Sequence, residues 1–155
     1  MASGGGHKDN YIVSSCELYD TAVCQWSPIA PLNIARQKHA AATHNYTVYV
    51  FGGWDLMRPR AEIEQYDADA NKWTLLKARL NEARGELAAA CVHSRIYILG
   101  GRIDKESDNG ETITTEPDAM DSFDPEKKEC RCVSKLPQAR RAHAVACYSV
   151  TVTDS

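Results

Sequence analysis

Histidines, cysteines and aspartates are the residues of this chain whose chemistry could support catalysis or metal binding. None of the 5 histidines forms a pair at metal-ligand spacing, and His39 and His143 occur in similar local sequences. Cys130-Arg131-Cys132 lacks a second cysteine pair at the spacing of a zinc site. Cys91 and Cys147 occupy equivalent positions and are expected to be small buried strand residues. We therefore expect reduced structural cysteines, no metal and no cofactor.

Catalytic motifs are also missing from the sequence. It contains no Gly-x-Ser-x-Gly, no phosphate-binding glycine loop and no His-Glu-x-x-His. Asp20, Asp67 and Asp124 each follow an aromatic residue, and this recurrence indicates turn residues rather than a catalytic set. The chain is therefore predicted to have no catalytic residues and to be a binding protein instead of an enzyme.

These residues belong to a sequence that repeats itself. The segments 36–42 and 48–53 return 48 residues later as 84–90 and 96–101, with an Ala-rich run followed by an alternating apolar run and two glycines. The segment 140–144 has the same pattern as the start of the first repeat. A period near this length indicates an array of small structural units.

A second recurring feature, an aromatic residue followed by aspartate, has the same spacing and is called the aromatic mark below. Tyr19-Asp20 precedes Trp26 by the interval at which Tyr66-Asp67 precedes Trp73, and Phe123-Asp124 precedes Cys130 in the same way. A double glycine stands before each mark, and in the first repeat we identify it as Gly5-Gly6. Cys130 thus replaces an expected tryptophan.

Together, the double glycine, the Tyr-Asp pair and the tryptophan resemble the kelch repeat, whose unit is one blade of a β-propeller. The resemblance covers roughly residues 5 to 148. It implies an all-β fold, an incomplete kelch β-propeller built of four-stranded antiparallel blades. Four segments are expected: the end of a partial blade (1–27), a complete blade (28–74), a second complete blade (75–132) and the start of a truncated one (133–155).

Propellers close with about 4 to 8 blades. The chain is therefore expected to be a fragment, a splice product or a piece that pairs with the remaining blades of a propeller or with a second copy. Its unpaired edges predict weak cooperativity in isolation. Because such truncations cost about 3–5 kcal/mol in a packed core, Cys130 should make the third blade the weaker one.

Each repeat has the pattern of a hairpin. Small residues at 40–43 suit the strand nearest the propeller axis, and alternating residues at 48–51 suit the second strand. Trp73 is expected between blades. The segment from Arg102 to Asp118 is rich in acidic residues and poor in apolar ones, so we predict a mobile acidic loop.

The formal net charge of −3 gives no basic field for nucleic acid. The amino terminus has no apolar signal region, and no run is long enough to span a membrane. We expect neither nucleic acid nor membrane as a partner, and a cytoplasmic location that extends to the nucleus in some settings.

Alternating strand directions bring the second-to-third loops, the blade linkers and the starts of the inner strands to one face. Arg36, Arg84 and Arg140 recur at one position and are interpreted as structural, so specificity is expected where repeats differ. Mixed charge with an exposed Trp54 is typical of peptide-binding surfaces. The alternative for Arg58 and Arg60 is an ordinary solvated loop. The candidate partner-binding residues on this face are Lys38, Trp54, Asp55, Met57, Arg58, Arg60, Arg79, Asn81, Glu86 and Arg102.

The resemblance is strongest to the kelch domain of BTB-kelch proteins. It implies a protein-protein interaction module that recognises substrates for a cullin-3 ubiquitin ligase, gripping a short acidic or hydrophobic segment, while a separate BTB domain, which this chain lacks, binds the cullin. Two alternatives stay open. One is an actin-associated cytoskeletal scaffold, and the other is an oxidase-type or glycan-processing propeller with a metal or carboxylate cluster at the axis.

Overall fold

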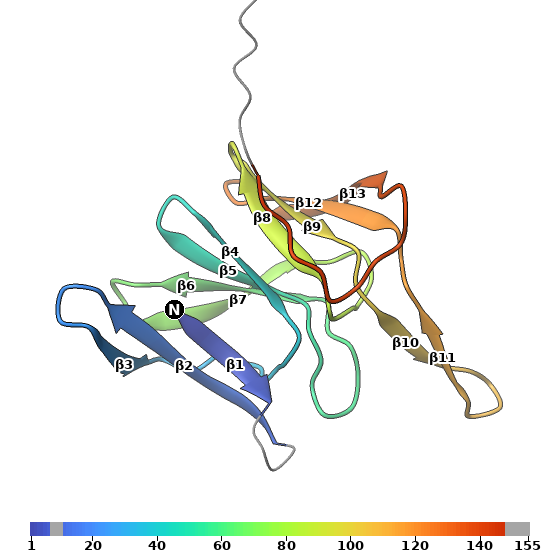
Figure 1. Ribbon diagram of the computed structural model, residues 1–155, viewed down its shortest axis with the longest axis horizontal. Helices are drawn as coiled ribbons and strands as arrows, with labels where there is room; N and C mark the ends of the chain where they lie inside the picture. Colours follow the sequence, from blue (N-terminus) through green and yellow to red (C-terminus); the bar gives the residue numbers. More distant parts are fainter. Residues whose placement is uncertain (7–10, 148–155) are drawn as a thin grey trace, which may run out of the picture.

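The computed structural model describes residues 1–6 and 11–147, which form three antiparallel sheets and a separate hairpin (Figure 1). The first sheet has three strands in the order β1-β2-β3. Its strands are β1 (Ala2–Gly6), β2 (Ile12–Asp20) and β3 (Gln25–Ile29). It has one strand fewer than each of the two larger sheets.

The central and third sheets have four strands each, as predicted. The central sheet has the order β4-β5-β6-β7, and the third has β8-β9-β12-β13. The central strands are β4 (Ala40–His44), β5 (Thr47–Phe51), β6 (Glu62–Asp67) and β7 (Lys72–Arg79). The third sheet contains β8 (Ala88–Val92), β9 (Arg95–Leu99), β12 (Ala119–Asp124) and β13 (Glu129–Lys135).

The outer strands β3, β7 and β13 continue past their repeat marks. The predicted segment boundaries near residues 27, 74 and 132 therefore fall inside these strands. Residues 133–135 belong to β13, and residues 148–155 of the expected truncated blade lie outside the described residues.

Strand pairing places the aromatic marks in one register. Tyr19 lies opposite Trp26, Tyr66 opposite Trp73, and Phe123 opposite Cys130. The following aspartates shape the turns, as expected: the Oδ1 atoms of Asp20, Asp67 and Asp124 accept backbone N–H groups two or three residues later at 2.8–3.1 Å. Cys130 is thus the structural equivalent of Trp73.

The double glycines let neighbouring sheets approach. Gly53 has a φ of 98°, and its N–H donates to the Arg84 carbonyl at 2.9 Å. In the first sheet the matching donor is Gly5, which bonds the Arg36 carbonyl at 2.9 Å. The equivalent pair is therefore Gly4-Gly5, and the predicted Gly5-Gly6 was wrong by one residue, because β1 pairs with β2 through a register shift between Ser3 and Gly5.

Apolar side chains fill two clusters between the sheets. The cluster joining the central and third sheets contains Phe51, Ile63, Ile96 and Phe123 among its buried members. The second cluster joins the first and central sheets around Trp73, which is 3% exposed. Trp73 therefore lies between blades, as its repeat position predicted.

Each four-stranded sheet also contains a buried Arg–carboxylate pair. Arg36 Nη2 donates to Glu64 Oε1 at 2.8 Å, and Arg84 Nη2 lies 2.9 Å from Asp121 Oδ2. All four side chains are buried. Each arginine precedes the inner strand of its sheet, and each acid lies in the third strand. The ion pair therefore connects the segment that enters the inner strand to the third strand.

Amide side chains complete these two pairs. Asn33 Nδ2 donates to Glu64 Oε2 at 2.8 Å, and Asn81 Nδ2 donates to Asp121 Oδ1 at 2.8 Å. The pairing of opposite charges makes such burial tolerable. Arg84 Nη2 and Asp121 Oδ2 form an ion pair without hydrogen-bond geometry. The predicted structural role of Arg36 and Arg84 is confirmed, whereas Arg140 is exposed.

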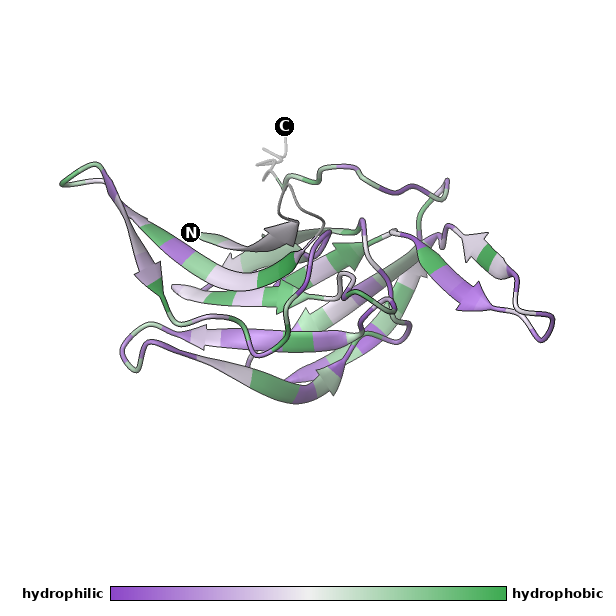
Figure 2. Ribbon diagram, turned by 90° about the horizontal axis from the view of Figure 1, so that it is seen from below, coloured by the Kyte–Doolittle hydropathy of each residue, from purple (hydrophilic) through white to green (hydrophobic). Residues whose placement is uncertain are grey.

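The predicted acidic loop after Arg102 was wrong, since the segment forms a hairpin. Strand β10 (Ile103–Glu106) pairs with β11 (Thr112–Thr115), and Gly110 takes a φ of 80° in the turn. The β-branched run at 112–115 favours a strand despite the surrounding charge. Figure 2 shows the hairpin extending away from the sheets with mostly hydrophilic residues.

All six cysteines lie among the described residues and are free. Cys16 is buried, Cys91 and Cys130 are partly buried, and Cys147 is exposed. The expectation of burial was therefore wrong for Cys147, whose segment ends against β8 with no strand beyond it in the described part of the chain. Over residues 1–6 and 11–147, no helix has the length and apolarity to cross a membrane.

Candidate functional site

The starts of the inner strands meet at one face, which we call the axial face. Lys38, Glu86 and Ala142 occupy one repeat position and share positive φ angles of 54°, 57° and 48°. The Glu86 N–H donates to the Lys38 carbonyl, and the Ala142 N–H donates to the Glu86 carbonyl, both at 2.8 Å. Backbone hydrogen bonds thus align three consecutive segments side by side.

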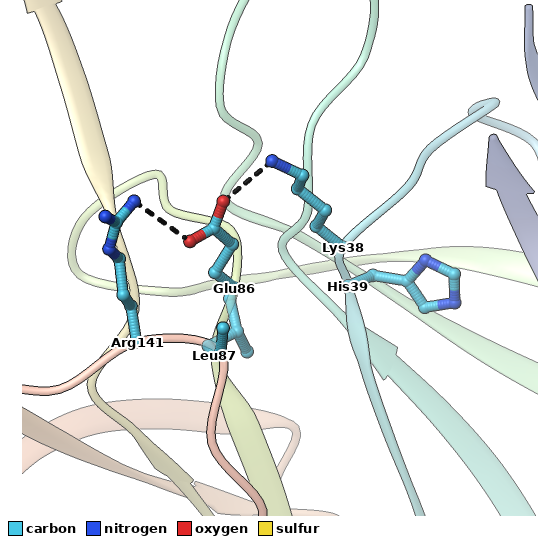
Figure 3. A pocket seen from close by; sticks show the side chains of 6 residues that line it. Lys38, His39, Glu86, Leu87 and Arg141 are labelled. Atoms are coloured by element: carbon cyan, nitrogen blue, oxygen red, sulfur yellow. Dashed lines mark hydrogen bonds and ion pairs between the residues drawn. The ribbon is translucent and has the colours of Figure 1, made fainter.

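Glu86 is the centre of a charge cluster on this face (Figure 3). Its Oε1 lies 2.7 Å from Lys38 Nζ, its Oε2 lies 3.4 Å from Arg141 Nη1, and Arg102 Nη1 is 4.0 Å away. The Lys38 hydrogen bond lowers the pKa of Glu86, against the opposing effect of burial. The Glu86 side chain is 11% exposed, against 47% for Lys38 and 41% for Arg141. The cations therefore cover the carboxylate and face the solvent.

A second cluster forms at the base of the hairpin. Arg102 contacts both carboxylate oxygens of Asp104, at 2.9 and 2.8 Å, and Thr114 Oγ1 donates to Asp104 at 2.8 Å. The Arg102 hydrogen bonds lower the pKa of Asp104, and Asp104 raises the pKa of Arg102. The guanidinium carbon of Arg102 lies 5.9 Å from the centre of the Trp54 ring. The base of the hairpin thus contributes the Arg102–Asp104 ion pair to the axial face.

Trp54 was predicted to be an exposed aromatic, and this prediction was wrong. The residue is half-buried, and its backbone bridges Gln37 and Pro59. Its ring covers Gly85 so closely that a Cβ at that position would overlap it. Trp54 therefore packs one loop against the next inner strand, and only part of the ring is available to a ligand.

The loop after Trp54 divides into a fixed part and a free part. Asp55 Oδ1 accepts the Met57 and Arg58 N–H groups at 2.7 and 2.8 Å, and Asp55 Oδ2 lies 3.1 Å from Arg60 Nη1. Burial opposes ionisation, but these bonds lower the pKa of Asp55 overall. Met57 is 91% exposed, and Arg58 is also exposed. Arg58 fits the solvated-loop alternative, whereas Arg60 is held in an ion pair.

Two further candidates have mainly structural partners. Arg79 Nη2 lies 2.8 Å from Glu62 Oε1, and Glu62 Oε2 lies 3.1 Å from Arg60 Nε. Asn81 bonds buried Asp121, as described above. Asn81 is exposed, but its amide turns toward the third sheet, so its described side-chain partner is structural.

The axial face is hollowed beside Glu86. A depression of about 590 Å³ is lined by Lys38, His39, Glu86, Leu87, Arg141 and Ala142. A neighbouring one of about 440 Å³ lies between the loop after Trp54 and the hairpin. Of the predicted residues, Lys38 and Glu86 line the first depression, and Trp54, Met57 and Arg58 line the second. Asp55 and Arg102 line a third depression of about 250 Å³, together with Lys38 and Trp54.

Sequence reasoning missed Arg141 and Asp104. Arg141 occupies the repeat position of Gln37 and Gly85, so the rule that specificity lies where repeats differ could have found it. Asp104 could be placed only by recognising the hairpin. Within residues 1–6 and 11–147, no three or more His, Cys, Asp or Glu side chains are grouped as metal ligands.

Comparisons with known proteins agree with this geometry. Residues 35–78 match the kelch motif family. The chain is 28% identical to mouse Kelch-like protein 40 over 126 residues, covering 81% of this chain and 20% of that protein. It is 31% identical to human Kelch repeat and BTB domain-containing protein 12 over 104 residues, covering 61% of this chain and 16% of that protein.

A solved structure, that of YjhT, shares the fold. The TM-score is 0.74 at 15% identity, over 88% of this chain and 43% of the YjhT chain. The chain spans between about a sixth and a quarter of the length of the curated relatives it matches. With the strand registers described above, these likenesses support a kelch-repeat domain built of β-propeller blades, similar to the kelch domains of BTB-kelch proteins.

Proposed function

We propose that this run of kelch blades is a protein-protein interaction module, and that its axial face binds an acidic segment of a partner protein. The observation that supports this proposal best is the layering of charge around Glu86, where exposed cations cover a carboxylate that is almost buried. An approaching carboxylate therefore meets ammonium and guanidinium groups first.

The same layering recurs around the face. Asp104 is less exposed than its partner Arg102. Glu62 is likewise less exposed than its partner Arg79, which is 58% exposed. Charge-assisted hydrogen bonds to a ligand carboxylate are stronger than neutral ones, and arginine can offer two of them at once. Leu56 and Met57 are exposed beside these cations. The ligand that fits combines acidic residues with an apolar neighbour.

A peptide probe tests this binding mode. A labelled peptide of six glutamates and one leucine should bind the chain in a fluorescence anisotropy titration, and its glutamine counterpart should bind at least about tenfold more weakly. The double variant Lys38→Met and Arg141→Met should bind the glutamate peptide more weakly than the unchanged protein, by a similar factor. Lys127→Met, in the turn between β12 and β13 at the opposite end of the third sheet, is the matched control and should change nothing. Equal binding of both peptides would reject the acidic-ligand proposal.

The finer assignment that we favour is substrate recognition for a cullin-3 ubiquitin ligase in the cytoplasm or nucleus. It is supported by the kelch repeats and by a relative whose name includes a BTB domain. Affinity capture with the full-length protein should recover cullin-3. Recovery of actin alone would favour the cytoskeletal scaffold, and stoichiometric copper in the purified protein would favour an oxidase-type propeller.

A further inference from the structure

The backbone of β10 faces alternately toward β11 and away from it. The Ser107 N–H donates to the Glu111 carbonyl at 2.8 Å at the turn, which fixes the phase of this alternation. Two residues earlier, Lys105 therefore bonds across the hairpin. The N–H and carbonyl groups of Asp104 and Glu106 point the other way, to the outer edge of β10.

This outer edge is occupied at one end. Arg102 and Gly85 exchange two backbone hydrogen bonds there, at 2.7 and 3.1 Å. Further along, the backbone groups of Asp104 and Glu106 have no partner in the part of the chain that the structure describes. Each residue offers one N–H donor and one carbonyl acceptor, and an edge of this kind readily accepts another strand.

A groove follows the open edge. The depression of about 440 Å³ has β10 on one side and the loop after Trp54 on the other, with Met57 and Pro59 in its lining. Met57 is 91% exposed, and Trp54 is half-buried. A strand that pairs with β10 would therefore have apolar side chains of the loop beside it.

The groove continues to the charge cluster around Glu86. The depression of about 250 Å³ shares Trp54 and Asp104 with the groove, and it shares Lys38 with the depression beside Glu86. The three depressions thus form one path across the axial face, from the open edge of β10 to the cations.

The two ends of this path differ in charge. Around Glu86 three cations face one carboxylate. Beside β10 two cations and two carboxylates balance, namely Arg58, Lys105, Asp104 and Glu106. The first end therefore attracts acidic side chains, whereas the second suits an uncharged segment that covers the exposed apolar side chains of the loop.

We propose that the partner segment binds along this path as an extended strand that pairs antiparallel with the outer edge of β10. Its apolar residues come first and lie beside Met57, and its acidic residues follow and reach the cations around Glu86. In strand addition the backbone bonds supply affinity and alternate side chains supply specificity. The inference rests on the proposed function, and it adds the binding mode and the sequence pattern of the ligand.

Two proline substitutions in one cross-strand pair test the edge. Glu106 and Thr112 lie opposite each other, and their N–H groups face opposite edges of the hairpin. Proline at either position removes no ladder bond, as is usual for proline in edge strands. Glu106→Pro should weaken binding of the labelled, acetylated peptide Val-Thr-Leu-Thr-Glu-Glu-Glu at least about tenfold in fluorescence anisotropy, and Thr112→Pro should change it less than about twofold.

Two controls accompany the prolines. Circular dichroism checks that both variants keep their strand content. Glu106→Gln removes the charge but keeps the backbone N–H, so it should bind the acidic peptide at least as tightly as the unchanged protein. Weaker binding by Glu106→Gln would assign the effect to the side chain and overturn the strand pairing.

Methylation of the peptide backbone gives an independent readout. Because one side of a strand faces its neighbour, N-methyl groups on the Val and Leu of the peptide, or on its two Thr residues, should have unequal effects. One pattern should weaken binding at least about tenfold, and the other less than about twofold.

Equal effects of the two methylation patterns, or of the two prolines, would overturn the strand pairing. The acidic-ligand proposal would still stand if the unchanged protein preferred this peptide to its glutamine counterpart. Loss of that preference would reject the proposed function itself, so the two failures are distinguishable.

Discussion

The central and third sheets are two versions of one blade, and they differ most at the tryptophan position. Both have four strands in the same order, a buried Arg–carboxylate pair and a double glycine. The central sheet has Trp73, whereas the third has Cys130. The polar pair is thus kept where the aromatic residue is lost, which indicates that the pair contributes more to the shape of a blade than the tryptophan does.

The two positions have different surroundings. Trp73 Nε1 donates to the Ala30 carbonyl at 3.0 Å, and its ring centre lies 5.0 Å from that of Tyr66. Cys130 packs against the cluster between the central and third sheets, where burial raises the pKa of its thiol to about 12. The cysteine behaves as a small apolar residue that leaves the outer edge of the third sheet less well covered.

The largest effect is expected from removing the arginine of the central sheet. Arg36→Leu would leave Glu64 buried without its partner and would free the Gly52 and Glu62 carbonyls, which Arg36 Nη1 bonds at 2.7 and 3.0 Å. Loss of one partner of a buried ion pair costs about 3–5 kcal/mol. Urea denaturation should show a loss of this size, or a chain that does not fold.

Arg84→Leu sharpens the comparison, because Arg84 makes fewer hydrogen bonds. Its Nε donates to the Gly100 carbonyl at 2.8 Å, its Nη1 donates to the Glu82 carbonyl at 3.3 Å, and it forms an ion pair with Asp121. We expect a smaller loss of unfolding free energy than for Arg36→Leu. An equal loss, or none in either variant, would contradict the role assigned to these pairs.

The next largest loss of stability is expected when the tryptophan of the central sheet is replaced by the cysteine of the third. Trp73→Cys should lower the free energy of unfolding by about 3 kcal/mol, because a large buried ring is removed from a packed cluster. Cys130→Ala should cost about 1 kcal/mol, since little volume changes. Equal losses in thermal denaturation would show that the two positions are energetically alike.

The contact between the first and central sheets should depend on pH, unlike the one between the central and third sheets. His39 Nε2 lies 3.1 Å from Ser3 Oγ, whereas Leu87 occupies the equivalent position in the third sheet. Burial, with the nearby Arg36 charge, lowers the pKa of His39 to about 4, although Glu64 acts in the opposite direction. The unfolded chain therefore binds the extra proton between about pH 6.5 and 4, and stability falls as the pH drops through this range.

We expect a loss of about 2 kcal/mol between pH 6.5 and 4.5, measured by urea denaturation. Burial also lowers the pKa of His143, which adds in the same direction. His39→Gln can keep a hydrogen bond to Ser3 and should flatten most of this dependence. An unchanged slope in His39→Gln would assign the pH effect to other groups.

The smallest difference in stability is expected between alanine substitutions at two glycines with positive φ. A Cβ at Gly53 would lie 2.8 Å from the Gln37 carbonyl oxygen and 2.9 Å from His39 Cβ, whereas a Cβ at Gly110 would meet nothing within 4 Å. Gly53→Ala should cost about 2 kcal/mol, and Gly110→Ala about 1 kcal/mol from backbone strain alone. Equal costs would mean that the inter-sheet approach at Gly53 is loose.

Repetition explains what the sequence could predict of the fold. The recurring Tyr-Asp and tryptophan positions placed the third and fourth strands, and the recurring arginines indicated a structural role that Arg36 and Arg84 confirm. The hairpin after Arg102 occurs once, so no second copy revealed its register. The extra residue of β2 opposite the first double glycine was hidden, because a bulge changes spacing without changing residue types.

The candidate site was harder to predict because it depends on side-chain direction. Trp54 and Asn81 lie near the expected face, but one ring packs on Gly85 and one amide turns to Asp121. Lys38, Glu86 and Arg102 were found because the topology alone places them at strand starts and a loop. Arg141 completes the cluster from a segment that was interpreted only as the start of another blade.

The stacking of consecutive inner strands about one axis is tested most directly by cross-linking native cysteines. Cys91 and Cys147 share a repeat position, and Cys147 Sγ lies 3.0 Å from the Cys91 carbonyl oxygen. A short bismaleimide followed by mass spectrometry should join Cys91 to Cys147 as the main product within one chain. A main product joining Cys147 to Cys24, in the turn of the first sheet, with no link to Cys91, would contradict the stacked arrangement.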